Sequence, residues 1–405
     1  MSDRRVVITG LGVVSPIGLG KDGFWQALIA GKSGIRPITA FDTSDYPCHN
    51  GGQVWDFNPD DYLSKESTKR MGRASQFAAA TAGMAIEDAG LSGRLDPERT
   101  GVSLGSTNGE AGVMEAVSDV WIKERWQQIN PHLIAQYPPQ LIPANVAIEF
   151  GIEGPVVMMP NACAAGNWAI GHAYDLIRSG DVDVMLAGGT DPISRAAFVG
   201  FSRTFSMTKD LCQPFDKNRK GMLVSEGAAT LLLEDLDCAR KRGARIYAEI
   251  AAYGLSCDAH HITGPHPEGL GAARAMRNAL AGSGLSDDDI DYISAHGTGT
   301  KANDKVETLA IKSVFREHAK KIPVSSIKSM MGHTMGAASA IEAVACALAL
   351  SEGIIPPTIN FSEPDPDCDL DCVPNEARDY KAEAILSNSF AFGGNCSVLA
   401  LRKWR

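Results

Sequence analysis

Two stretches decide the fold: CAAGNWAIGHAYDLIRSG at residues 163–180 and GAASAIEAVACALALSEG at residues 336–353. They have equal length, open with small residues, become apolar, and close on a glycine that can end a helix. Because small residues let two backbones approach closely, each stretch predicts a tightly packed central helix. The repetition predicts two duplicated halves that meet near residue 245. The alternative is that all buried helices of layered α/β proteins look alike.

Short apolar runs alternate with helical patterns on both sides of these stretches. The runs are bounded by Gly and Pro and predict buried strands at residues 5–14, 100–106, 154–160, 182–189, 245–255, 291–297, 322–329 and 382–390. Apolar residues at helical spacing predict further helices at residues 24–32, 73–90 and 271–284. This alternation predicts an α/β protein with mostly parallel or mixed sheets, divided into residues 1–245 and 246–405.

Composition excludes several functional classes. The formal net charge of −10 argues against a nucleic-acid binder, because phosphate contacts need a basic surface. The nine cysteines have no regular spacing, which predicts reduced thiols and a cytoplasmic location. A zinc site at Cys368 and Cys372 would need a second Cys/His pair of zinc spacing, so no metal is predicted.

The N-terminus, residues 1–18, has charges before an apolar run, as a signal peptide would. Its β-branched residues, its glycines and Pro16 favour a buried strand and turn instead. We expect no stretch that could span a bilayer, and therefore no membrane insertion.

The first candidate for chemistry is Cys163, in PNACAAGNWAIG at residues 160–171. It follows an apolar strand and begins a helix, so the helix dipole and unpaired backbone N–H groups favour its thiolate. The strand-to-helix bend is similar to the nucleophile elbow of other acyl-transfer enzymes. The alternative is a buried structural cysteine.

Two histidines lie in Gly-rich loops. His296 follows a predicted strand in SAHGTGT, residues 294–300, at the sheet edge where α/β proteins usually bind ligands. Thr298 and Thr300 add uncharged hydroxyls suited to a polar substrate arm. His333 lies in KSMMGHTMGA, residues 328–337. A lone histidine is often structural, but the HGTGT context favours a functional one.

Lys328 and Glu342 predict a buried ion pair. Glu342 is the only charge within an apolar helix, and a buried carboxylate needs a partner. A Lys328 ammonium beside His333 would keep that imidazole neutral, so that it donates a hydrogen bond. The alternative is a surface lysine on a kinked loop.

The segment NSFAFGGNCS, residues 388–397, ends a predicted strand in Phe390, Phe392 and two glycines. The glycines allow a backbone N–H to point into a site, and a phenylalanine could act as a gate; read alone, the segment is a core strand and turn. A thiol, two histidines, a Lys–Glu pair and this donor loop together make an acyl-transfer set. A hydrolase would instead want a His–Asp pair to activate water.

In order and spacing, six segments resemble the elongating β-ketoacyl-acyl-carrier-protein synthases over essentially the whole chain: VVITGLGVVSPIG, NACAAGN, FDKNRKGMLVSEGAA, HGTGT, KSMMGHTMGA and SFAFGG. The resemblance implies a thiolase-like fold of two duplicated halves in a five-layer αβαβα arrangement, working as a homodimer without metal or organic cofactor. It implies decarboxylative condensation of malonyl carrier with an acyl group, in fatty-acid or related lipid and polyketide biosynthesis. The implied partner is an acyl carrier protein, loaded with acyl or malonyl groups.

The resemblance also implies residue roles. Cys163 becomes the nucleophile, and His296 and His333 become the decarboxylation pair. Lys328 becomes the supporting cation, held by Glu342. The N–H groups of Cys163 and Phe392 become the oxyanion hole, with Phe392 also the gate. The implied substrate-binding residues are Thr263, Thr298, Thr300, Asn108 and Phe390.

Three departures from the family pattern bear on the acyl chain. Asn395-Cys396 replaces the usual Thr-Asn, and Ala391 stands where Gly is common between the phenylalanines. Asn108 stands where an apolar residue usually faces the acyl pocket. With Met159, Pro160 and Trp168, these departures open a specialised or secondary-metabolite synthase as an alternative to the usual fatty-acyl preference.

Carrier proteins are acidic, so a basic docking surface is expected. KESTKRMGR, residues 65–73, spaces Lys65, Lys69 and Arg73 by four, which predicts one helix face. Arg70 is a neighbour, and Arg203 lies in a separate loop. An ordinary solvated face is the alternative.

Two rival functions stay open. A thiolase-type enzyme would use coenzyme A thioesters with Cys396 as its second cysteine, but here two histidines replace a His–Cys pair and Cys396 follows the Gly-Gly. A catalytically silent partner subunit that shapes chain length would lack the nucleophile, and this chain keeps Cys163.

Overall fold

The sheet runs from one half of the chain into the other through the pairing of β1 (Val6–Ser15) with β9 (Ala248–Cys257). The structure, a computed structural model, describes residues 4–123 and 125–404. Both strands consist of the β-branched and small residues that predicted them, and β1 is buried along its whole length. The junction of the halves is therefore part of the core.

Strand order is the same on both sides of this junction. From β1 outward come β8 (Gly227–Asp235), β7 (Val184–Asp191), β5 (Thr100–Gly105) and β6 (Val156–Met159). From β9 outward come β15 (Asn395–Arg402), β14 (Ala384–Phe390), β10 (Tyr292–Ser294) and β11 (Val324–Ser325). In each set the first three strands pair antiparallel and the outer three pair parallel. This repetition confirms the predicted duplication.

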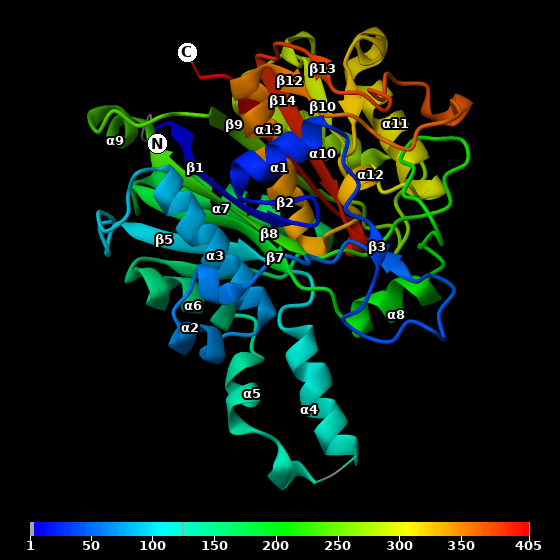
Figure 1. Cartoon of the computed structure of the whole chain (residues 1–405). Coiled ribbons are helices and arrows are strands. Elements are labelled where there is room, and N and C mark those ends of the chain that lie inside the picture. The colour runs from blue at the N-terminus through cyan, green and yellow to red at the C-terminus, as the bar shows by residue number, and fades with distance from the viewer. Residues whose placement is uncertain (1–3, 124, 405) are drawn as a thin grey trace.

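Helices cover both faces of each set of strands, which gives five layers (Figure 1). On the outside of the first set lie α3 (Arg73–Asp88) and α6 (Leu141–Phe150). On the outside of the second set lie α10 (Leu270–Ser283) and α11 (Lys301–Phe315). Between the sets, α7 (Ala165–Ser179) contacts α13 (Ala338–Glu352). The predicted five-layer αβαβα arrangement is present.

The two central helices are the two stretches that predicted the fold. Each follows a three-residue turn, η3 (Ala162–Ala164) or η6 (Met335–Ala337), and each ends on a left-handed glycine. Small residues set their distance: a Cβ on Gly166 of α7 would lie 2.8 Å from the backbone nitrogen of Ala340 in α13. The helices can therefore cross only with glycine at this position.

The remaining α-helices and strands surround this core. They are α1 (Gly20–Ile29), α2 (Lys65–Arg70), α4 (Ala111–Lys123), α5 (Pro131–Gln136), α8 (Arg195–Arg203), α9 (Leu236–Lys241), α12 (Lys328–Met331), β2 (Gly18–Leu19), and the pairs β3 (Arg36–Pro37) with β4 (Asn50–Gly51) and β12 (Ile354–Ile355) with β13 (Arg378–Asp379). We call residues 111–123 and 125–137 the arm, because α4 and α5 project from the body (Figure 1).

Some predicted elements differ from the structure. The strand predicted at residues 322–329 is only the two-residue β11, because the chain turns into α12 at Lys328. One helical stretch, Met335–Glu352, is long and apolar enough to span a membrane by composition, so the expectation that none exists was wrong; 89% of it is buried inside the protein. The division of the chain at residue 245 stays a prediction. Residues 1–3, which belong to the N-terminal segment that was compared with a signal peptide, lie outside the described residues.

Candidate active site

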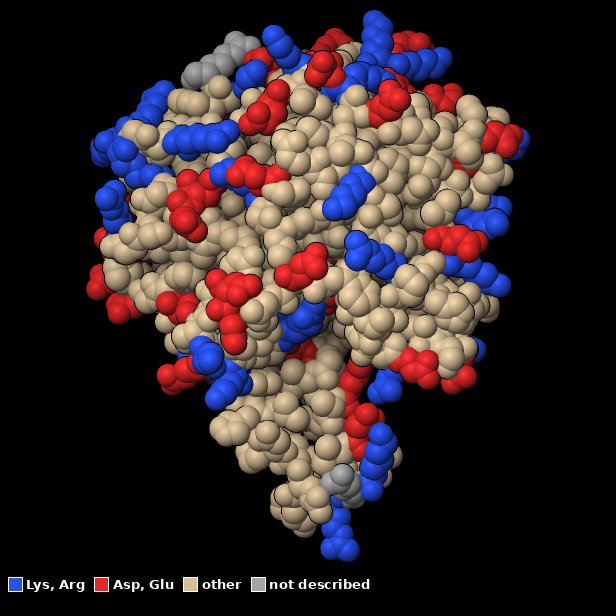
Figure 2. All heavy atoms as spheres, viewed as in Figure 1, with Lys and Arg blue, Asp and Glu red and all other residues tan. Residues whose placement is uncertain are grey.

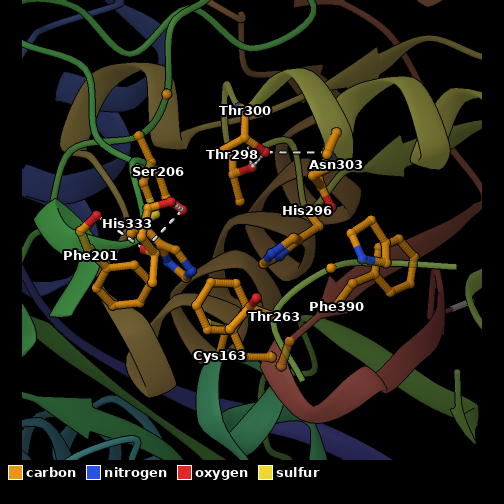
Figure 3. Close-up of a pocket in the computed structure, with 18 of the residues that line it drawn as sticks. Cys163, Phe201, Ser206, Thr263, His296, Thr298, Thr300, Asn303, His333 and Phe390 are labelled. Carbon is orange, nitrogen blue, oxygen red and sulfur yellow. Dashed lines mark hydrogen bonds between the residues drawn. The ribbon is translucent and has the colours of Figure 1, made fainter. Parts of the chain in front are cut away.

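A cavity of about 420 Å³ receives side chains from both halves of the fold. Cys163 reaches it from the start of α7, whereas His296, His333 and Phe390 reach it from loops and a strand end of the second half (Figure 3). The structure thus brings together the thiol and both imidazoles that the sequence singled out in three separate segments.

Cys163 lies on a strained turn between β6 and α7. Ala162, the residue before it, has a φ of 50°, in the left-handed region that few residues other than glycine adopt. The turn is the elbow expected from the sequence, and it aims the sulfur at the cavity. Cys163 itself is buried.

The predicted thiolate is wrong for the resting protein. Burial raises the pKa of the Cys163 thiol to about 12, although the Lys328 ammonium and the residue's own N–H lower it. A helix end carries only a partial charge, so it does not offset the loss of water around the sulfur. The thiol is therefore neutral until a reaction removes its proton.

His296 and His333 lie edge to face, with ring centroids 5.4 Å apart (Figure 3). Both are buried, and the Nδ1 atom of each lacks a hydrogen-bond partner among the described residues. Burial lowers the pKa of both imidazoles well below the ordinary value, and the Lys328 ammonium lowers it further. Each ring is consequently neutral and carries a single N–H donor.

The main chain at the two histidines is held in place by hydrogen bonds of its backbone N–H groups. Glu307 in α11 accepts hydrogen bonds from the N–H groups of His296 and Gly297, each at 2.8 Å. The N–H of His333 donates to the carbonyl of Leu223 at 2.7 Å. These contacts fix the main chain and leave the imidazoles to face the cavity.

The predicted Lys328–Glu342 pair is present, and both side chains are buried. Burial raises the pKa of Glu342 to about 7, and Lys328 opposes that rise. Neither side chain lines the cavity. The ammonium therefore acts on the thiol and the imidazoles through its charge and not through contact with a substrate.

Four of the five predicted substrate-binding residues line the cavity: Thr263, Thr298, Thr300 and Phe390. The hydroxyls of Thr298 and Thr300 are 2.9 Å apart, and Thr300 also caps α11. Asn108 does not line this cavity; it is exposed, three residues before α4. Phe392 lines the cavity, with its ring centroid 5.5 Å from that of Phe201.

The predicted basic helix face is wrong. Met71 and Gly72 are extended, so α2 ends at Arg70 and a new helix begins at Arg73. Arg73 bonds the buried carboxylate of Glu226 through two nitrogens, at 2.9 and 2.7 Å. A guanidinium held in this way is not available to a partner.

The other predicted docking cations differ in their surroundings. Arg70 bonds the side chain of Asn145 and lies 3.6 Å from the Glu149 carboxylate. Lys65 and Lys69 are exposed on α2. Arg203 is exposed at the end of α8, next to the cavity-lining residue Thr204.

Sequence reasoning missed a group of cavity residues in the last turn of α8 and beyond it. These are Phe201, Thr204, Phe205, Ser206, Lys220 and Met222. Phe205 is 90% exposed and has a φ of 56°, which turns its ring outward at the cavity mouth. The available signal was FVGFSRTFSM at residues 198–207, where aromatic residues recur three and four positions apart.

Cys368 and Cys372 are buried in the hydrophobic core of the second half. Within residues 4–123 and 125–404, no group of three or more His, Cys, Asp or Glu side chains is arranged to hold a metal ion.

A buried thiol beside two neutral imidazoles, on a duplicated five-layer α/β fold, defines a thiol-dependent acyltransferase of thiolase-like architecture. Residues 3–239 match the family described as "Beta-ketoacyl synthase, N-terminal domain", and residues 247–362 match "Beta-ketoacyl synthase, C-terminal domain". The chain therefore belongs to the β-ketoacyl synthase family.

Individual relatives agree over the full length. The chain is 42% identical to the 3-oxoacyl-[acyl-carrier-protein] synthase 2 of Synechocystis, covering 100% of this chain and 99% of that protein. It is 43% identical to the protein of the same name from Coxiella burnetii, with the same coverage.

Solved structures agree as well. "The ishigamide ketosynthase/chain length factor" has a TM-score of 0.96 at 44% identity and covers 99% of this chain and 100% of that one. A type II polyketide ketosynthase determined in complex with an acyl-carrier protein has a TM-score of 0.91 at 35% identity, with the same coverage.

The neutral imidazoles give the first prediction. In a proton NMR titration between about pH 8 and pH 5.5, a range that includes the ordinary imidazole pKa of about 6.5, His296 and His333 should stay neutral. Replacing the buried pair together, Lys328→Met with Glu342→Gln, removes the cation without leaving an unpaired carboxylate. The pKa of both imidazoles should then rise. Titration of either ring in the unmodified protein, or no change in the double variant, contradicts this account.

Proposed function

We propose that the protein is a 3-oxoacyl-[acyl-carrier-protein] synthase, which holds an acyl group on Cys163 and condenses it with the malonyl unit of a malonyl carrier. One observation carries the proposal: two neutral imidazoles, His296 and His333, share a cavity with the thiol of Cys163, which lies in the turn before a helix. The curated relatives of 42% and 43% identity carry this activity in their names.

The first half-reaction loads the acyl group. The Cys163 sulfur attacks the carbonyl carbon of the acyl thioester, its proton leaves, and the carrier thiol departs once the tetrahedral intermediate collapses. The N–H groups of Cys163 and Phe392 stabilise the oxyanion; one such donor contributes about 10²–10³ in rate. Because the pKa of the thiol is raised to about 12, a neutral imidazole in the cavity is the group that takes the proton.

The second half-reaction forms the carbon–carbon bond. The malonyl thioester oxygen accepts hydrogen bonds from His296 and His333, which stabilise the enolate as the carboxylate leaves as carbon dioxide. The enolate carbon attacks the acyl-Cys163 thioester, the carbon–sulfur bond breaks, and the released thiolate takes a proton from solvent. Because the Lys328 cation lowers the pKa of both rings, each ring stays neutral and donates a hydrogen bond through its single N–H group.

We propose the cavity mouth as the carrier docking site. Phe205 and Ile262 are 90% and 79% exposed there, on two segments that flank the cavity. Lys220 and Lys301 also line the cavity and are exposed, and Arg203 lies beside Thr204. An acidic carrier that contacts the two apolar side chains would also meet these cations. The thioester that it carries would then enter the cavity past Thr263, Thr298 and Thr300.

We also propose that the protein works as a dimer of identical chains in the cytoplasm. The arm exposes large apolar side chains: Trp121, Ile122, Trp126, Ile134 and Tyr137. Figure 2 shows it as a mostly uncharged projection at the bottom of the molecule. The strand β6 is the last strand at one end of the large sheet, and no other strand of the described residues pairs with its outer edge. A second copy that covers the arm and extends the sheet would remove both features.

All nine cysteines are free, as expected of a reducing compartment.

The acyl substrate belongs to fatty-acid or related lipid and polyketide biosynthesis. The curated relatives are named as 3-oxoacyl-[acyl-carrier-protein] synthases, and the similar solved structures include polyketide ketosynthases. Ala391 and Cys396 both line the cavity, so two of the departures from the family pattern lie where a substrate passes.

Substitutions at the two key residues separate the half-reactions. Cys163→Ala should abolish acyl transfer, detected by intact mass spectrometry after exposure to acyl carriers. His333→Ala should still take the acyl group but lose condensation about 10²-fold or more, because one of two donors to the enolate is gone. Failure of the His333→Ala variant to acylate would overturn its assigned role. Product from acetyl-coenzyme A alone, without malonyl carrier, would point to a thiolase instead.

The docking proposal has its own test. Phe205→Ser should raise KM for malonyl carrier about tenfold or more, because a buried aromatic contact contributes about 1.5–3 kcal/mol. The rate with malonyl-pantetheine, which lacks the carrier protein, should not change. Ile148→Ser on α6, which removes a different exposed apolar side chain, is the matched control and should leave both parameters unaltered. An unchanged KM in Phe205→Ser would move the docking site elsewhere.

Sedimentation velocity tests the dimer. The purified chain should sediment with twice the 43.0 kDa of one polypeptide, and Trp126→Asp in the arm should yield the monomer. Phe205→Asp, a charge placed on the other apolar surface, should remain dimeric. A native monomer that dimerises only with a second, non-identical synthase chain would show that the partner is a related subunit and not a copy.

A further inference from the structure

The strained turn that carries Cys163 occurs a second time in this fold. Before α7 the turn η3 begins at Ala162 with a φ of 50°, and before α13 the turn η6 begins at Met335 with a φ of 53°. Each turn precedes a 15-residue helix that ends on a left-handed glycine. When the turns Ala162–Ala164 and Met335–Ala337 are aligned residue by residue, Gly336 takes the position of Cys163. The second half therefore keeps the elbow without a nucleophile.

The surroundings of the two turns correspond as well. Gly105 pairs with Gly189 and Met159 in the first half, as Ser294 pairs with Ser387 and Ser325 in the second. Thr107 lies two residues after Gly105, and His296 lies two residues after Ser294, so these two residues correspond. In the same way, Asp191 lies two residues after Gly189 and corresponds to Ser389, two residues after Ser387. Asp191 thus occupies, beside Gly336, the position that Ser389 occupies beside Cys163.

Asp191 fills the space in front of the second elbow. Its carboxylate accepts hydrogen bonds from the N–H groups of Gly336 and Thr107 at 2.7 Å and of Asn108 at 3.0 Å. The hydroxyl of Ser106 donates a fourth, at 2.7 Å. Asp191 is completely buried, and within the described chain no cation forms an ion pair with it. Three converging backbone N–H groups are a typical anion-binding concavity.

The fit between the carboxylate and the turn is close. A Cβ on Gly336 would lie 2.7 Å from Oδ2 of Asp191 and 2.7 Å from the backbone nitrogen of Thr107. Burial raises the pKa of Asp191 to about 6, with the four hydrogen bonds opposing the rise, so the group is ionised at neutral pH. The anion and the glycine therefore depend on each other.

We propose that the turn at Gly336 is a second anion hole, permanently filled by the Asp191 carboxylate, and that Asp191 is a positioning residue for His333. Met335 holds a conformation that non-glycine residues adopt only under constraint. The bond from the Gly336 N–H to Asp191 supplies that constraint three residues after His333. Without the anion the turn relaxes, and the imidazole leaves the place where it meets the malonyl thioester. The functional part of this inference rests on the proposed function.

A matched residue separates positioning from mere structural support. Asp216 is also a buried carboxylate, and it accepts from the three backbone N–H groups of Asn218, Ser362 and Glu363 and from the Ser362 hydroxyl. It has the same donor set as Asp191 but does not bond the 333–337 segment. Asp216→Ala therefore removes an equivalent buried carboxylate without releasing His333.

The experiment compares Asp191→Ala and Asp216→Ala with the unmodified full chain, with and without sodium formate. Acylation of Cys163 is followed by intact mass spectrometry, and malonyl-carrier decarboxylation by release of carbon dioxide. Asp191→Ala should keep acylation but lose decarboxylation at least tenfold, part of the about 10²–10³ that one donor contributes. Formate, a carboxylate small enough for the vacated hole, should restore decarboxylation and raise the melting temperature of this variant, whereas chloride at the same concentration should not. Asp216→Ala should change both half-reactions in the same proportion.

Equal loss of both half-reactions in folded Asp191→Ala, or no response to formate in either readout, overturns the inference. The melting temperature is measured without turnover, so it tests the anion hole even if the variant is inactive. If the unmodified chain does not decarboxylate malonyl carrier, the proposed function fails; if it does and Asp191→Ala does so equally well, only this inference fails.

Discussion

The burial of the reactive side chains at the junction of the two halves is the constraint on which the rest of the site depends. Burial keeps the thiol of Cys163 protonated and both imidazoles neutral. A neutral site does not repel an incoming thioester, and its hydrogen-bond donors are fixed before charge develops. Charge that forms on a substrate oxygen beside buried groups interacts strongly with fixed donors, because burial weakens screening by solvent. The fold buries these side chains by packing two central helices between two sets of strands.

The buried Lys328–Glu342 pair is the complement of this neutral site. A lone ammonium in the core would be very unfavourable, but a pair has no net charge and still produces a local field. Lys328 is the charge with the strongest effect on Cys163, His296 and His333 alike, and in each case it favours the form with one proton fewer. One cation, outside the cavity, thus prepares the thiol for deprotonation and keeps both rings as donors.

Much of the fold and site could be predicted because the information is local. The two repeated stretches are central helices, and motifs at Cys163, His296, His333 and Lys328 bring their residues to one place. What failed depends on tertiary context. The spacing in residues 65–73 matched a helix face, but Met71 and Gly72 break the helix. The helix dipole favoured a thiolate, but burial outweighs it. Phe205 was missed because the aromatic spacing at residues 198–205 is typical of a buried helix face, whereas Phe205 lies in a loop and is exposed.

Duplication explains why a carboxylate lies opposite the nucleophile. Two copies of one strand–turn–helix unit place two strained elbows in contact near the centre of the molecule. Each elbow presents backbone N–H groups that attract negative charge. In the first copy the cavity is left open, so the charge can be that of a reacting substrate beside Cys163. In the second copy Asp191 supplies the charge permanently, and the same geometry holds the loop of His333 in place. One structural unit thus serves once for chemistry and once for support, and the two copies differ in the residue at the elbow, Cys163 or Gly336, and in the residue beside it, Ser389 or Asp191.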